Sequence, residues 1–63
     1  MFRIELTEQE LASLTEALEA DLSNLSVEIA NTDRLAFREQ LKHRRDAMKS
    51  ALDKLRAAEA AAA

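Results

Sequence analysis

Two leucine-rich segments are joined by Asn31-Thr32-Asp33, and this break constrains the fold more than any other feature of the sequence. Asn tolerates the left-handed conformation that closes a helix, while Thr and Asp accept hydrogen bonds from the free amides of the next helix. The connection is therefore about two to four residues long, and a connection that short makes its two helices antiparallel. We expect a helical hairpin that turns at residues 32–33.

The first helix, over residues 7–31, has a marked start. Thr7 is an N-cap candidate, and Glu10 lies three positions on and completes a capping box. Leu6 and Leu11 occupy the two positions of a hydrophobic staple. Apolar residues then recur every 3.6 positions on average, so they share one face of the helix. This first stripe consists of Leu11, Leu14, Leu18, Leu22, Leu25 and Ile29.

The second helix is expected over residues 34–58, with residues 59–63 as an alanine-rich tail that continues the helix and frays. Its apolar stripe consists of Phe37, Leu41, Met48, Leu52 and Leu55, with Ala51 beside them. The composition supports helices throughout, because the chain lacks Gly and Pro and is rich in Ala, Leu, Glu, Lys and Arg.

Arg44 and Arg45 interrupt the second stripe, and folding back about residue 32 brings them level with Asp21 and Leu22. Two interpretations stay open: their stems cover apolar surface while their heads reach solvent or Asp21, or they form a buried or interfacial ion pair that fixes the register. Counting positions back from residue 32 in the same way places Glu28 opposite Arg38. We expect contact between these two side chains to hold the helices together at the turn.

A chain of 63 residues buries only about 60% of the surface that its unfolded form exposes. Small proteins usually add disulfides, a metal or a partner chain, and this chain has no Cys and a single His. A partner chain is therefore expected. We predict a homodimer or higher homo-oligomer in which the two apolar stripes pair hairpins into an antiparallel four-helix bundle.

The charge distribution favours the same arrangement. Residues 1–30 hold one basic and seven acidic side chains, whereas residues 31–63 hold eight basic and five acidic ones. The halves therefore carry net charges of -6 and +3. Such asymmetry favours laying the first helix against the second, within one chain or between two copies.

The N-terminal segment, residues 1–6, is expected to be extended. Phe2, Ile4 and Leu6 alternate with charged residues, which is the pattern of a strand with one apolar face. Either this segment pairs with the same segment of a second chain, or it lays Phe2 and Ile4 on the helices. It lacks the apolar run of a signal peptide or membrane span, so we expect a soluble cytoplasmic protein without a membrane partner.

Chemical machinery is hard to find, and we expect no catalytic activity, no cofactor and no metal. The sequence has no Cys nucleophile, no Gly-rich phosphate loop and no pair of His residues at metal-binding spacing. Glu39 and His43 stand four positions apart, but such a pair on a helix is ordinarily a weak surface contact.

Two other functions compete with self-association. A basic ridge, defined as Arg34, Arg38, Lys42, Arg45 and Lys49, recurs at helical spacing and suits the phosphates of a nucleic acid. Against this function stand the acidic net charge of -3 and the lack of a second recognition helix. Alternatively, the chain is an adaptor whose leucine stripe receives a helix from another protein.

The segment Leu22–Asp33, followed by Phe37-Arg38, Leu41-Lys42 and Arg44-Arg45, resembles a group of short, uncharacterised bacterial proteins. Their general form is Leu-Thr-x-x-Glu, a leucine-rich segment, Glu-Ile-x-x-Thr-Asp, an aromatic-Arg pair and a leucine-rich charged segment. The resemblance covers Leu6 to about Leu55. It implies a helical hairpin and assigns no catalytic or binding residue.

Overall fold

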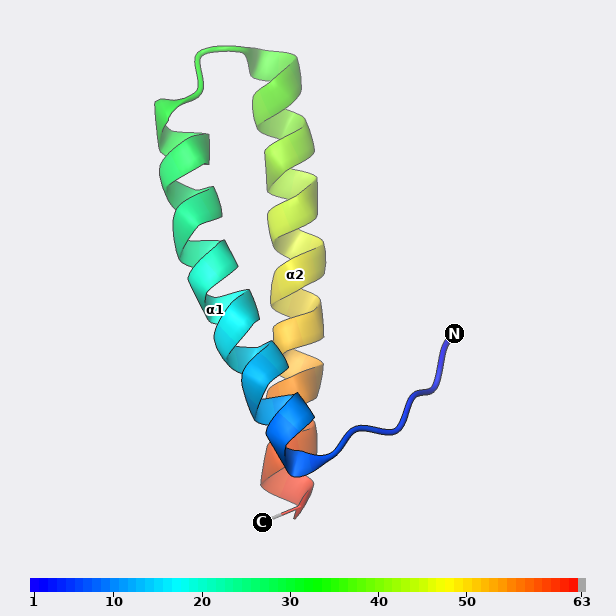
Figure 1. Ribbon diagram of the computed structural model, residues 1–63. Helices are drawn as coiled ribbons and strands as arrows, with labels where there is room; N and C mark the ends of the chain where they lie inside the picture. Colours follow the sequence, from blue (N-terminus) through cyan, green and yellow to red (C-terminus); the bar gives the residue numbers. More distant parts are fainter. Residues whose placement is uncertain (63) are drawn as a thin grey trace.

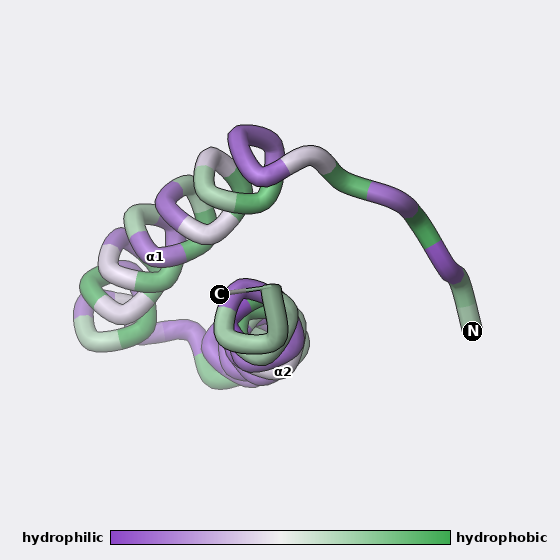
Figure 2. The backbone as a smooth tube through the Cα atoms, turned by 90° about the horizontal axis from the view of Figure 1, so that it is seen from below, coloured by the Kyte–Doolittle hydropathy of each residue, from purple (hydrophilic) through white to green (hydrophobic). Residues whose placement is uncertain are grey.

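The computed structural model describes residues 1–62, which form two helices and no strand (Figure 1). α1 spans Glu8–Asn31 and α2 spans Leu35–Ala62. The helices run antiparallel, and α1 crosses α2 obliquely, as the view along α2 in Figure 2 shows. The prediction of an all-α chain with two packed helices is confirmed for these residues.

α1 begins as predicted, with a complete capping box. The main-chain N–H of Glu10 donates to the Thr7 hydroxyl at 3.1 Å, and the Thr7 N–H donates to Glu10 Oε1 at 2.8 Å. These bonds satisfy two amides that a helix start leaves without partners. The Thr7 N–H, followed by the Thr7 hydroxyl, also lowers the pKa of the Glu10 carboxyl, because both stabilise its charged form.

The turn differs from its prediction in three respects. Asn31 does not adopt the left-handed conformation; instead Thr32, with φ -90° and ψ 124°, leads the chain out of α1 in extended form. The Thr32 hydroxyl faces back and donates to the Glu28 carbonyl at 2.6 Å, which closes α1 rather than capping α2. The turn covers residues 32–34, since α2 starts at Leu35.

α2 continues through the alanine-rich tail to Ala62, as the helix propensity of that tail predicts. Ala has the highest helix propensity, and Glu59 within this stretch contacts α1. The fraying tail predicted at residues 59–63 is thus helical as far as Ala62. Its last residue, Ala63, lies outside the described residues.

The core is small and lies between the helices. Leu25, Ile29 and Leu41 form its centre, with Met48 packed against them, and Leu52 is buried further along α2. Each of the four buried residues is between 5% and 8% exposed, and no side chain within residues 1–62 is completely buried. The hairpin therefore covers only part of its two apolar stripes.

Two stripe residues lie outside this core. Leu14 is 42% exposed and Phe37 is 48% exposed, whereas Thr15, which was not expected in the core, is 8% exposed. The oblique crossing of the helices explains why Thr15 rather than Leu14 is buried in α1 (Figure 2). Toward its N-terminal end, the side of α1 that meets α2 shifts from the Leu14 position to the neighbouring Thr15 position.

Residues 1–5 extend sideways from the start of α1 (Figures 1 and 2), whereas Leu6 is half-buried and Thr7 caps the helix. Phe2 is 101% exposed and Ile4 is 76% exposed. The alternative in which this segment lays both side chains on the helices is therefore wrong. Pairing of the segment with a second chain stays a prediction.

Candidate self-association surface

The hairpin has two broad faces, which we name after the adjacent arginines that mark them. On the Arg44 face, Arg44 lines a hollow together with Asp21, Asn24, Leu25, Glu28 and Met48. On the Arg45 face, Arg45 and Lys49 line a hollow together with Leu22, Ser23 and Ser26. The predicted proximity of Arg44 to Asp21 and of Arg45 to Leu22 is thus confirmed.

The Arg44 face carries mostly apolar residues along α2 and mostly charged residues along α1. Residues seven positions apart share one side of a helix, so Phe37, Ala51 and Ala58 follow the same line of α2 as Arg44. In α1 the line through Asp21 and Glu28 begins at Leu14. Half-buried Leu18, Met48 and Leu55 lie between these lines and the core. The exposed parts of Leu14 and Phe37 therefore belong to the same face, near its two ends, with the charged hollow between them.

The Arg45 face is polar, and polar contacts within the chain already occupy it. An ion pair of 2.9 Å joins Arg56 Nη2 to Glu19 Oε1 across the helices, with both side chains about half exposed. Lys42, Lys49 and Arg56 follow one line of α2 at seven-residue spacing. The Ser26 hydroxyl donates to the Leu22 carbonyl at 3.0 Å.

Neither arginine that interrupts the second stripe forms a buried ion pair within residues 1–62. Arg45 is half-buried and binds Asp46 Oδ1 at 3.2 Å, so its stem covers Leu22 while its head stays near solvent. Arg44 is exposed, and no ion pair joins it to Asp21 within this part of the chain. The geometry agrees with the covering role for Arg45.

Arg38 contacts α1 across the turn, as predicted, but the acceptor of its hydrogen bond differs from the prediction. Arg38 Nε donates to the main-chain carbonyl of Ile29 at 3.2 Å, so the predicted pairing of Arg38 with Glu28 is wrong. Counting residues around the turn places the Arg38 side chain opposite that of Glu28. Such counting does not show that the main-chain carbonyl of Ile29, near the end of α1, lies within reach of the Arg38 guanidinium group.

The members of the basic ridge fall on α2 and the turn, and several are engaged. Arg38 donates a hydrogen bond to the Ile29 carbonyl, and Arg45 forms an ion pair with the Asp46 carboxylate. Lys42 Nζ lies 3.6 Å from Glu39 Oε1. Arg34, in the turn, and Lys49 are exposed. The ridge runs along the Arg45 face, where α1 contributes serines beside it.

Sequence reasoning missed two contacts between the helices. One is the Glu19–Arg56 ion pair; the other is the hydrogen bond of 3.3 Å from the Thr15 hydroxyl to Glu59 Oε1. The Thr15 hydroxyl also donates to the Leu11 carbonyl at 2.9 Å, so its single proton is shared between two acceptors. The available signal for the ion pair was that its opposite charges directly follow the stripe residues Leu18 and Leu55.

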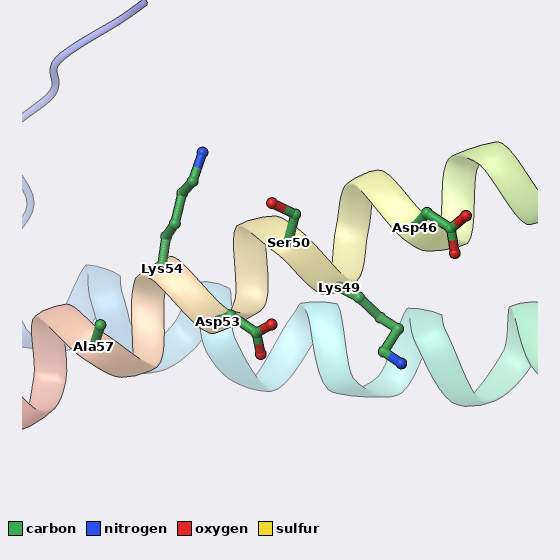
Figure 3. A pocket seen from close by; sticks show the side chains of 6 residues that line it. All are labelled: Asp46, Lys49, Ser50, Asp53, Lys54 and Ala57. Atoms are coloured by element: carbon green, nitrogen blue, oxygen red, sulfur yellow. The ribbon is translucent and has the colours of Figure 1, made fainter.

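The hollow in Figure 3 is an open surface on α2 alone. Its lining consists of Asp46, Lys49, Ser50, Asp53, Lys54 and Ala57. The charged side chains diverge from one another in this view, so they do not converge on a common point. Within residues 1–62, no three His, Cys, Asp or Glu side chains gather as metal ligands.

Neither helix contains a stretch long and apolar enough to cross a membrane. Comparison with protein families, curated proteins and solved structures finds no match for this chain.

Proposed function

We propose that this chain is a self-associating structural module whose hairpins pair as a homodimer and form a four-helix bundle. The observation that carries the proposal is the exposure of Leu14 and Phe37, at 42% and 48%, beside a core of four buried apolar residues. A single hairpin leaves much of its apolar surface in water. A second copy removes that surface from water at about 25 cal/mol per Å².

The other two functions have weaker support. Binding of nucleic acid requires free cations, but Arg38, Lys42 and Arg45 already have acceptors within the chain. An adaptor would use the same apolar surface with a different occupant. A cytoplasmic location and membership of the group of short bacterial helical-hairpin proteins stay predictions.

Sedimentation equilibrium at micromolar concentrations tests the proposal, with helicity followed by circular dichroism on the same samples. We expect a dimer whose melting temperature rises with concentration, because the folded state is stabilised by mass action. A chain that stays monomeric and fully helical at every concentration would contradict the proposal. That result would favour the adaptor function.

A further inference from the structure

We propose that the second copy docks on the Arg44 face and leaves the Arg45 face in contact with solvent. This inference rests on the proposed self-association and specifies its surface. Four observations support it: the apolar residues on the α2 side of this face, its size, the placement of its charges, and the polar contacts that occupy the opposite face.

The contrast between the two faces is clearest along α2. On the Arg44 face, the line Phe37, Arg44, Ala51 and Ala58 contains one charged residue. On the Arg45 face, the line Lys42, Lys49 and Arg56 is entirely basic. Small alanines allow a second helix to approach closely, whereas burying three lysine or arginine heads carries a large desolvation cost.

The other exposed aliphatic side chains of the two helices, Val27 and Leu35, do not form a rival surface. Val27 is two positions from both Leu25 and Ile29, which places it on the opposite side of α1 from the core. Leu35 stands at the start of the basic line on the Arg45 face. Single exposed apolar residues of this kind are normal on protein surfaces.

The Arg44 face is large enough for a stable interface. The described chain is 42 Å long. Two helices side by side, each about 10 Å in diameter, present a face about 20 Å wide. The resulting area matches the roughly 800 Å² per partner that stable protein interfaces bury.

The charges on this face suit a second copy in one particular orientation. Asp21 and Glu28 lie on its α1 side and Arg44 on its α2 side, at the same height along the hairpin because they line one hollow. A two-fold axis parallel to the helices places α1 of one copy against α2 of the other at equal height. Arg44 of each copy then faces the acidic side of its partner, and both turns lie at the same end of the bundle.

Two substitutions that add the same charge to opposite faces test this inference. Ala51 and Ser23 are both exposed helical residues, Ala51 on the Arg44 face and Ser23 on the Arg45 face. Ala51→Glu should raise the dimer dissociation constant by at least about 100-fold, because it buries a carboxylate against the acidic helix of the partner. Ser23→Glu should change the constant by less than about threefold, as expected for an exposed surface charge.

Sedimentation equilibrium of the wild type and both variants gives the three constants. An unchanged constant for Ala51→Glu, or a loss of dimer in Ser23→Glu, would overturn the choice of face while self-association stands. A monomeric wild type would overturn the proposed function itself and this inference with it. Helicity of the variants under dimeric and monomeric conditions separates loss of docking from loss of helix, since Glu is a good helix former.

Discussion

Arg38 Nε, in the first turn of α2, donates a hydrogen bond to the main-chain carbonyl of Ile29, near the end of α1. The last carbonyls of a helix lack partners within the helix and carry the negative end of its dipole. The last turn of α1 contains no basic residue of its own. α2 therefore supplies the cation that completes the end of α1, which links the two helices across the turn.

Arg38→Met should destabilise the hairpin by about 1 kcal/mol, because it removes this hydrogen bond and keeps most of the apolar stem. Chemical denaturation followed by circular dichroism measures the change. Glu28→Gln is the matched control and, at concentrations where the chain is monomeric, should alter stability by less than about 0.5 kcal/mol, as for a surface position. A larger effect of the control would show that Glu28 is the true partner of Arg38.

Thr7→Ala should destabilise the helical state by about 1 kcal/mol, since it removes the hydroxyl that accepts from the Glu10 amide. Denaturation curves at neutral pH report this loss. Ser13→Ala removes a hydroxyl from an exposed position inside α1 and should have little effect. Equal losses in both variants would mean that the cap does not stabilise α1.

The capping box also predicts a pH dependence. The Thr7 hydrogen bonds lower the pKa of Glu10 below its ordinary value of 4.5, so the charged form stabilises the folded state. This stabilisation is present above about pH 4.5 and is lost as the pH falls through the lower folded-state pKa. The stability difference between wild type and Glu10→Gln, measured from pH 7 to pH 3, should shrink below pH 4.5. A difference that is constant with pH would contradict this role.

Arg44→Leu should weaken the dimer, because it removes the cation that faces Asp21 and Glu28 of the second copy and leaves both carboxylates unpaired in the interface. The expected rise in the dissociation constant is about tenfold or more, and sedimentation equilibrium measures it. Arg45→Leu, on the opposite face, is the control and should leave the dimer constant nearly unchanged. Tighter association of Arg44→Leu would contradict the proposed pairing of Arg44 with the second copy.

The orientation of the two copies has its own test. The chain has no Cys, so Asp33→Cys provides a single site for a spin label in the turn. If both turns lie at the same end, the labels should be about 20 Å apart, roughly two helix diameters. Turns at opposite ends would separate them by about 40 Å, the length of a helix of 26 residues. Pulsed electron paramagnetic resonance distinguishes the two distances.

The parts of the fold that were predictable from the sequence depend on residues close together in the chain. The capping box joins Thr7 to Glu10, and helix periodicity places Leu25, Ile29, Leu41 and Leu52 in the core. Such signals need no knowledge of how the helices cross. They therefore settled the helical class and the packing of the two helices.

The errors arose where the relative position of the helices decides the outcome. Periodicity cannot show that α1 crosses α2 obliquely, so it could not predict that Thr15 is buried and Leu14 exposed. It also treats Arg38 as a partner for side chains, whereas the nearest acceptor is a main-chain carbonyl. For the candidate surface, helix periodicity predicted the residues of the two apolar stripes. It could not predict on which face of the hairpin parts of these stripes are exposed to solvent.

Three side-chain hydrogen bonds join the helices of the described chain, and they differ in how much chain each one closes. Arg38 and Ile29 are 9 positions apart, Glu19 and Arg56 are 37 apart, and Thr15 and Glu59 are 44 apart. Because closing a longer loop costs more entropy, we expect folding to begin at the turn and proceed toward the open end. Amide hydrogens near Glu8 and Ala62 should then exchange with solvent first, while those beside the Arg38–Ile29 bond are protected longest.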